Sequence, residues 1–157
     1  MKFYATLLAL VSAVVAQSAQ IGAPQEGSSV AAGSNFTMMI EKPNSLSGSQ
    51  DIAIVVGLAP GDVDSGLGEI LYQGPFNPQY ATPPGTLPPH QNYSLQIPAS
   101  FAAGKATLGV AHFSLIGAAT LPNLEIFNTT LTITNATSGS SVTTRAIRSM
   151  RILGNRA

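Results

Sequence analysis

The chain has 157 residues, a formal net charge of zero and no cysteine. Only 9% of the residues are charged, so the chain lacks the charge excess that attracts nucleic acid or anionic lipid. The lack of cysteine excludes a disulfide scaffold, thiolate catalysis and a blue-copper site.

The first sixteen residues are typical of a secretory signal peptide. Lys2 gives a positive start, an apolar run extends from Ala5 to Val15, and Val14 and Ala16 suit the positions before a signal-peptidase cut. The run is too short for a membrane-spanning helix, and no later stretch has enough consecutive apolar residues for one. We therefore predict that residues 1–16 are removed, with a cut after Ala19 as the second choice, and that the protein is secreted, either extracellular or associated with a cell wall.

Residues 17–137 are expected to form a single all-β domain, because short apolar or alternating runs are separated by turn-forming residues. The expected strands are Gln20–Ala23, Ser29–Ala31, Asn35–Lys42, Asp51–Leu58, Glu69–Gln73, Tyr93–Ile97, Ala106–Ile116 and Phe127–Thr134. Asp51–Leu58 is apolar on both faces, which favours a central strand covered on both sides. About seven strands at this spacing predict an immunoglobulin/fibronectin-III-like two-sheet sandwich, with Ile97–Gly104 crossing between the sheets.

Two segments depart from the strand pattern. Gly74–Gln91 contains six prolines, which cannot donate to a sheet, so we expect a long surface loop. Residues 138–157 begin with a Gly/Ser linker and contain four arginines, so we expect a basic, disordered C-terminal tail. These arginines are Arg145, Arg148, Arg151 and Arg156.

Four N-glycosylation sequons begin at Asn35, Asn92, Asn128 and Asn135. The first three asparagines alternate with apolar residues, so a glycan on any of them would point away from the core. We predict that at least two of the four are occupied. The alternative is that they are ordinary polar positions on strands.

The acidic residues and histidines give weak metal signals. Asp62, Asp64 and Glu69 imitate part of a calcium loop, but the alternation of carboxylates is broken, which favours a solvated turn. His90 and His112 lack an evident third ligand, and His112 lies in an apolar run, where a hydrogen-bonded structural histidine is usual. We expect no metal and no cofactor.

No catalytic residues are assigned. The sequence lacks a Gly-x-Ser-x-Gly elbow and an evident Ser–His–acid set. A pair of carboxylates that hydrolyses a glycoside remains open, since any two of the seven acids could converge. We expect a protein that is not an enzyme.

The proline-rich loop is the candidate binding surface, because rigid aromatic side chains on a stiff loop are typical of carbohydrate or peptide recognition. Its candidate residues are Tyr72, Phe76, Tyr80, His90 and Tyr93. The same rings could instead hold the loop against the sandwich, which is the favoured alternative.

Three sequence patterns carry a family resemblance: Ile21–Phe36 (Ile-x-x-Pro-x-x-Gly-x-x-Val-x-x-Gly-Ser-Asn-Phe), the turn Lys42–Ser49, and Pro88–Tyr93. Over Gln20–Thr134 the chain resembles small secreted proteins of mushroom-forming fungi. More distantly, the first pattern is similar to the immunoglobulin-like domain of fungal cell-wall β-glucan assembly proteins. Both resemblances imply a secreted sandwich and no catalytic mechanism. Many relatives have a cysteine pair in the loop corresponding to Gly57–Gly68, which has none here.

Together these features predict a secreted, N-glycosylated, non-enzymatic β-sandwich protein of a fungal cell surface or matrix. Its expected partners are cell-wall polysaccharide or an extracellular protein, with no nucleic acid, no membrane span and a monomeric state. The alternative is a polysaccharide-active enzyme, hydrolytic or metal-dependent. A structural matrix component is a third option.

Overall fold

The computed structural model describes residues 18–44, 48–62, 66–83 and 85–135. The predicted signal peptide and basic tail lie outside these residues. The described residues form eight β-strands and no helix. They are β1 (Gln20–Ala23), β2 (Ser29–Ala31), β3 (Asn35–Glu41), β4 (Ser49–Pro60), β5 (Glu69–Pro75), β6 (His90–Gln96), β7 (Gly104–Ile116) and β8 (Leu121–Thr134).

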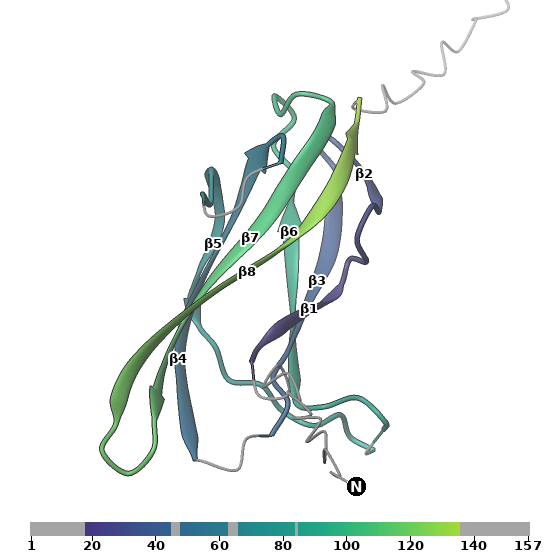
Figure 1. Cartoon of the computed structure of the whole chain (residues 1–157). Coiled ribbons are helices and arrows are strands. Elements are labelled where there is room, and N and C mark those ends of the chain that lie inside the picture. Colours follow the sequence, from purple (N-terminus) through teal and green to yellow (C-terminus); the bar gives the residue numbers. More distant parts are fainter. Residues whose placement is uncertain (1–17, 45–47, 63–65, 84, 136–157) are drawn as a thin grey trace, which may run out of the picture.

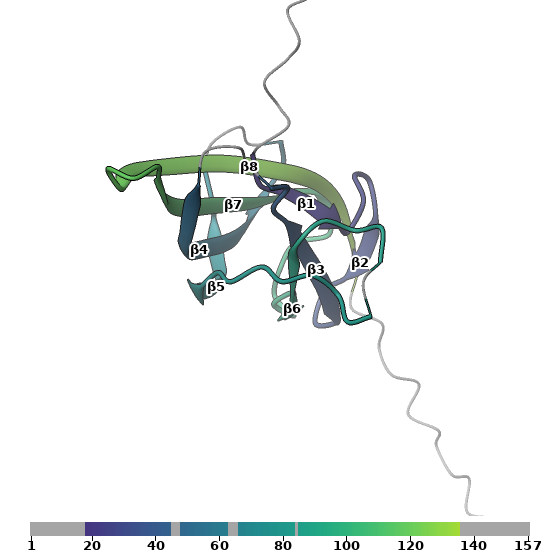
Figure 2. The same ribbon diagram turned by 90° about the horizontal axis from the view of Figure 1, so that it is seen from below.

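The strands form two sheets that face each other (Figures 1 and 2). The smaller sheet has the order β1-β3-β6, and the larger has the order β2-β8-β7-β4-β5. Neighbouring strands are antiparallel except for β2, which pairs in parallel with β8. This division of strands between two layers is that of an immunoglobulin/fibronectin-III-like sandwich, so the predicted fold class is confirmed.

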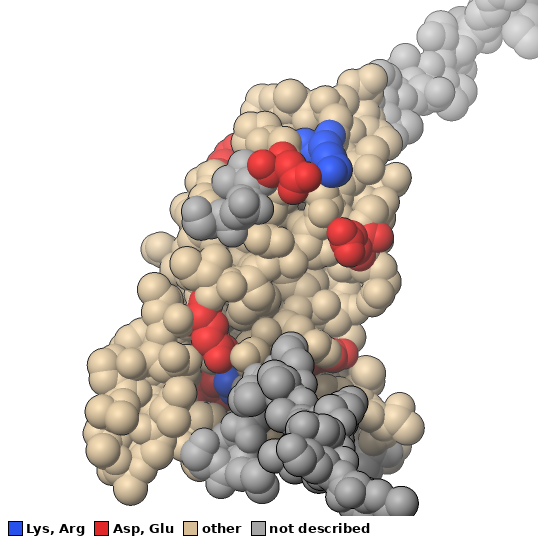
Figure 3. All heavy atoms as spheres, viewed as in Figure 1, with Lys and Arg blue, Asp and Glu red and all other residues tan. Residues whose placement is uncertain are grey.

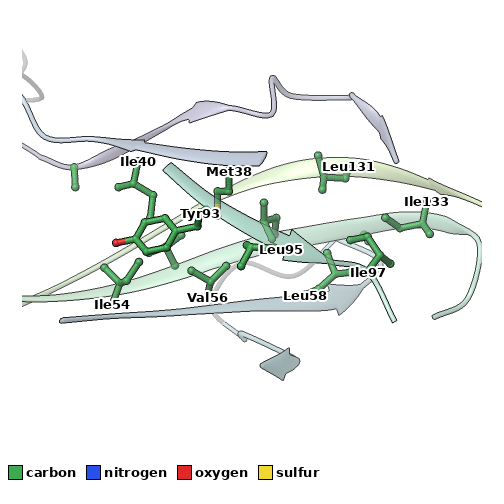
Figure 4. Packing of buried hydrophobic residues seen from close by; sticks show 14 of the residues in the cluster. Met38, Ile40, Ile54, Val56, Leu58, Tyr93, Leu95, Ile97, Leu131 and Ile133 are labelled. Carbon is green, nitrogen blue, oxygen red and sulfur yellow. The ribbon is translucent and has the colours of Figure 1, made fainter. Parts of the chain in front are cut away.

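The core lies between the two sheets and is built by the alternation of side chains along each strand (Figure 4). The inward residues of β3, β4, β6 and β8 are buried aliphatic side chains and one tyrosine. They are Met38, Ile40, Ile54, Val56, Leu58, Tyr93, Leu95, Leu131 and Ile133. Each such side chain contributes about 1.5–3 kcal/mol through burial, which accounts for a stable fold without a disulfide.

The crossover from β6 to β7 connects the two sheets where the sequence predicts it. Gly33 adopts φ 77° and its N–H donates to the carbonyl of Ile97, which fixes the start of the crossover. Gly104, with φ 133°, begins β7 in the larger sheet. A residue with a side chain would be strained at either position.

The β7–β8 hairpin is longer than the sequence suggests, because β8 begins at Leu121 and not at Phe127. The inward positions of this extension include the polar residue Glu125, whereas the outward positions include Leu124 and Ile126. Because the alternation is inverted, a sequence analysis that expects apolar residues on the inner face does not predict this part of β8.

The outward face of β4 is only partly covered, contrary to the prediction. Near Gly57, the backbone and side chain of Leu67 lie against the sheet. Toward the start of the strand, Ala53 and Val55 are half-buried and face outward.

Candidate functional site

The proline-rich loop, residues 76–89, connects β5 to β6. At its start, Phe76 is 1% exposed and packs in the core, and Tyr93 is 6% exposed. Tyr72 is half-buried, and its ring centroid lies 4.7 Å from that of Tyr93. Phe76 and Tyr93 are therefore buried from any partner, whereas Tyr72 packs against Tyr93 and keeps part of its surface exposed. Tyr80, by contrast, is 55% exposed.

The far side of the loop is fixed to the segment after β3. Asn44 donates a side-chain hydrogen bond to the hydroxyl of Tyr80, and the N–H of Lys42 donates to the carbonyl of Pro89. His90 exchanges two 3.0 Å backbone hydrogen bonds with Gln79, and its Nδ1 lies 2.9 Å from the carbonyl oxygen of Pro88. His90, the first residue of β6, is therefore a half-buried structural residue that fixes the end of the loop.

A hollow of about 290 Å³ opens between the proline-rich loop and the β3–β4 connection. Three prolines give it apolar walls, and a lysine, an aspartate, a serine and an asparagine supply polar groups. Its lining residues are Lys42, Pro43, Asn44, Gly48, Ser49, Asp51, Pro78 and Pro89. We call this region, together with the exposed ring of Tyr80, the loop site.

A buried charge cluster lies next to this hollow. The His112 side chain has no exposed surface, and carboxylate oxygens face both of its ring nitrogens. Its Nδ1 lies 3.1 Å from Glu125 Oε2, and its Nε2 lies 3.0 Å from Asp51 Oδ1, the latter an ion-pair contact without hydrogen-bond alignment. The ring of Phe76 packs edge-on against the imidazole at 5.2 Å.

Glu125 connects this cluster to the rest of the fold. Its Oε2 lies 3.8 Å from Lys42 Nζ and accepts a hydrogen bond of 3.4 Å from the backbone N–H of Ala19. Ala19 precedes β1 and Lys42 follows β3, and these two strands belong to the smaller sheet. Asp51, His112 and Glu125 lie on strands of the larger sheet. The cluster therefore ties the two sheets together.

The geometry of the cluster suits a structural role better than catalysis. The imidazole of His112 lies between Asp51 on β4 and Glu125 on β8, and Lys42 from the smaller sheet contacts the same Glu125. A catalytic base must reach its substrate, and the enclosed His112 cannot do so unless the sandwich opens.

Sequence reasoning singled out His112 but missed its carboxylate and lysine partners. The available signal was a charged residue next to apolar strand residues, as with Asp51 before Ile52 and Glu125 between Leu124 and Ile126. Because these acids come from different strands, only the sheet register brings them together.

The acidic residues of the calcium-like segment lie away from this cluster. Asp62 Oδ2 is 3.0 Å from Lys105 Nζ in an exposed ion pair, and Glu69 begins β5. Asp64 lies outside the described residues. Across the part of the chain that the structure describes, no three histidine, aspartate or glutamate residues form a group that could hold a metal ion. The same residues contain no helix with the length and hydropathy to cross a membrane.

The four sequon asparagines are exposed. Asn35 and Asn92 lie on the outer face of the smaller sheet, opposite Gln96 and Met39 respectively. Asn128 lies on the outer face of the larger sheet, and Asn135 follows β8. A glycan on any of the three strand positions would project away from the core.

Comparison with protein-family models gives one decisive match. Residues 14–132 match the model of the Nis1 family. The chain therefore belongs to the Nis1 family. The matched segment includes all eight strands except the last two residues of β8.

Two curated relatives in the Nis1 family match over nearly their whole length. Necrosis-inducing secreted protein 1 of Colletotrichum orbiculare is 29% identical over 161 residues, covering 99% of this chain and 91% of the relative. Necrosis-inducing secreted protein 1 of Colletotrichum higginsianum is 30% identical over 148 residues, covering 90% and 97%. These relatives confirm the prediction of a secreted, extracellular protein. They do not confirm the resemblance to proteins of mushroom-forming fungi or to cell-wall assembly proteins.

Two solved structures also align with this Nis1-family chain. A superoxide reductase (neelaredoxin) from Ignicoccus hospitalis aligns with a TM-score of 0.46 and 13% identity, covering 74% of this chain and 80% of the other. The fibronectin(III)-like modules of Clostridium thermocellum CbhA align with a TM-score of 0.45 and 8% identity, covering 76% and 100%. The assignment of the fold rests on the strand topology described above.

Proposed function

We propose that this chain induces necrosis in tissue exposed to it, and that it does so by binding a protein partner and not by catalysis. The observation that carries the proposal is its end-to-end match with two secreted proteins named for that activity. The match covers at least nine-tenths of each chain. The relatives therefore have no further domain, absent from this chain, to which the activity in their name would have to be assigned.

The loop site is the proposed contact surface. Its exposed ring, Tyr80, stands beside a hollow whose polar lining includes Lys42 and Asp51. A protein partner fits this surface better than a polysaccharide does, because Phe76 and Tyr93, which the sequence offered for stacking on sugar rings, are buried in the core. Tyr80 is the ring of this loop that is mostly exposed, so the loop offers little aromatic surface on which a sugar chain could stack.

Glycans on Asn35 and Asn92 are part of the proposal. Both would project from the outer face of the smaller sheet, where the side chains that alternate with the core face solvent. Enzymatic removal of N-glycans from the secreted protein should lower its mass by the mass of at least two glycans. Conversion of each asparagine to glutamine in turn should identify the occupied sites, and an unchanged mass would contradict this part of the proposal.

The test of function is infiltration of the purified secreted protein into leaf tissue, with cell death measured as ion leakage. We expect the wild-type protein to cause leakage and Tyr80→Ala to reduce it several-fold. Thr132→Ala, which alters an exposed position on β8, is the matched control and should behave as wild type. All three proteins must first give the same urea unfolding curve.

Each outcome has a distinct meaning. If the folded wild-type protein causes no leakage, the proposed function is wrong. If Tyr80→Ala acts as strongly as wild type, the function stands and the loop site is not the contact surface. Release of soluble sugar from wall material would instead support the polysaccharide-active enzyme.

A further inference from the structure

Three connections without charged residues meet at one end of the sandwich. The register places the β3–β4 connection, the proline-rich loop and the β7–β8 turn there, because Glu41 lies opposite His90 and Ser49 lies opposite Ile116 (Figure 1). The sequence of these connections and of the strand ends beside them has no aspartate, glutamate, lysine or arginine. The uncharged segments are residues 43–50, 76–89 and 113–124. We call their described residues the uncharged end.

The charged residues next to these segments are turned inward. Lys42, Asp51 and Glu125 flank them in the sequence, and these side chains are 9%, 13% and 22% exposed. All three belong to the buried charge cluster. At the opposite end of the sandwich, Asp62 and Lys105 form an ion pair whose side chains are mostly exposed. Figure 3 shows the contrast, since acidic and basic side chains stand near the top and the turn of the β7–β8 hairpin, at the lower left, displays none in that view.

Large apolar side chains protrude from the uncharged end. On the β7–β8 hairpin, Leu121 is 62% exposed and Leu124 is 64% exposed, and Leu87 on the proline-rich loop is 44% exposed. Leu121 and Leu124 are three residues apart on one strand, so they project from opposite faces of the hairpin. The N–H of Gly117 donates a 2.8 Å hydrogen bond to the carbonyl of Gly48, which holds the hairpin turn against the β3–β4 connection. The leucines are therefore presented on a fixed support.

This arrangement fits a fluid partner better than a rigid one. The leucines belong to two separate connections and to both faces of one hairpin, whereas a protein interface has a single closely packed apolar core. The boundary between headgroups and acyl chains of a bilayer admits separate apolar side chains. Anionic lipid is attracted by lysine and arginine near the surface, and the uncharged end has neither. The matching membrane surface is therefore one without net charge.

We propose that the uncharged end inserts Leu87, Leu121 and Leu124 into the surface of a bilayer of zwitterionic lipid, such as phosphatidylcholine. The sandwich stands end-on to the bilayer and does not span it, and its exposed Asp62–Lys105 pair stays in water. This inference goes beyond the proposed function, because it concerns a membrane surface and not the protein partner of the loop site.

The positions of the sequons are compatible with this orientation. Asn35 begins β3 and Asn135 follows β8, so both lie at the opposite end of the sandwich. Asn128 follows Leu121 along β8 at a distance of about 24 Å, given a rise of about 3.4 Å per residue. Asn92 projects from the outer face of the smaller sheet, which points sideways when the sandwich stands end-on. Glycans at these positions therefore leave the leucines accessible to lipid.

The amount of inserted hydrocarbon predicts weak, reversible binding. Three leucine side chains hold roughly as much hydrocarbon as one myristoyl chain, which binds bilayers with a constant of about 10⁴ M⁻¹. The leucines insert from a folded surface that already covers part of each side chain. We therefore expect half of the protein to be bound at about 0.1–1 mM lipid.

The test is co-sedimentation of the secreted protein with phosphatidylcholine vesicles, over lipid concentrations that extend to several millimolar. Wild type should bind, and Leu121→Asp with Leu124→Asp should bind at least tenfold more weakly. Thr132→Asp with Thr134→Asp, which adds the same charges to exposed positions at the far end of β8, is the matched control and should bind as wild type. Leu87→Asp, on the other connection, should weaken binding several-fold. All variants must first give the wild-type urea unfolding curve.

A milder pair, Leu121→Asn with Leu124→Asn, keeps the test informative if the aspartate pair fails to fold, and it should weaken binding at least threefold. Wild type that stays in the supernatant at every lipid concentration would overturn the proposal, as would an aspartate pair that binds normally. Binding that requires phosphatidylserine in the vesicles would also overturn it, because charge would then drive the contact. If wild type causes leakage in leaf tissue but does not bind vesicles, the proposed function stands and this inference is wrong.

Discussion

His112 is the residue on which the buried charge cluster depends. Its removal leaves the carboxylates of Asp51 and Glu125 without the group that separates them, and a buried charge that loses its partner destabilises a fold by about 3–5 kcal/mol. We discount this because both carboxylates keep some exposure, 13% and 22% of their side chains. We expect His112→Gln to lower the free energy of unfolding by about 2–4 kcal/mol in urea denaturation.

His90→Gln is the matched control. Its Nδ1 contacts the carbonyl oxygen of Pro88, and, although Glu41 lies opposite His90 on β3, no ion pair joins the two among the described residues. The expected loss of unfolding free energy is about 1 kcal/mol or less. Equal losses for the two histidine variants would contradict a special structural role for the cluster.

Tyr93 gives the fold a dependence on alkaline pH. Burial, and to a lesser extent the neighbouring Tyr72, raise the pKa of its phenol far above the usual value of 10. At pH values below that usual pKa, the phenol is protonated in both the folded and the unfolded chain, so its full contribution to the stability of the fold is present. At higher pH the unfolded chain releases the proton first, and stability falls as the pH rises. Urea unfolding at about pH 9 and about pH 11 should show this loss.

The Tyr93→Phe variant isolates the effect, because it keeps the ring in the core and removes the ionising group. Near neutral pH it should cost no more than about 1 kcal/mol, since its hydroxyl makes only a 3.4 Å contact with the carbonyl of Pro75. Between the two alkaline conditions it should lose less stability than wild type, whereas the exposed Tyr80→Phe should follow wild type. A Tyr93→Phe protein that loses stability as steeply as wild type would rule out this tyrosine as the cause.

At the scale of the strands, Gly57 allows the segment 66–68 to lie against β4. A Cβ atom at this position would stand 2.1 Å from the carbonyl oxygen of Leu67, so the segment would have to move. We expect Gly57→Ala to reduce the free energy of unfolding by about 1–3 kcal/mol. Gly85→Ala, where a Cβ meets no atom within 4 Å, should stay within about 0.5 kcal/mol of wild type. Equal stability of the two variants would show that Leu67 does not pack on the strand.

Elements whose inward residues are apolar were predictable from the sequence. β3 and β6 alternate core residues such as Met38 and Leu95 with polar ones, and both were predicted within three residues of their bounds. The start of β8 was not predictable, because its inward Glu125 is explained only by His112 on the neighbouring strand. Local alternation reports burial, and it fails where a long-range polar contact replaces apolar packing.

The candidate site was predictable to a smaller extent, because exposure of an aromatic ring is a tertiary property. The sequence placed Phe76 and Tyr80 in the same loop but could not distinguish a ring that anchors the loop from one that faces solvent. The sequence also could not show that Lys42 and Asp51 lie close together. These two residues line the same hollow from opposite ends of the β3–β4 connection. Those relations depend on the packing of one sheet against the other.

Over the whole molecule, the cluster extends to Ala19, the residue before β1. Ala19 is 4% exposed, and its N–H donates to Glu125, which in turn contacts His112 and Lys42. A signal-peptidase cut after Ala16 keeps this residue, whereas a cut after Ala19 removes both its methyl group and its hydrogen bond. The fold therefore favours the earlier cut, and we expect the secreted protein to begin at Gln17.

Mass spectrometry of the N-terminal peptide from the secreted protein decides between the two cuts. A shortened variant that begins at Gln20 should lose about 1–2 kcal/mol of unfolding free energy, because it gives up a buried methyl group and a hydrogen bond to a charged acceptor. Ala19→Gly, which removes the methyl group but keeps the N–H, should lose less than the shortened variant. If the secreted protein begins at Gln20 and is as stable as a chain that begins at Gln17, the cluster does not extend to the chain start, and its connection between the sheets rests on Lys42 alone.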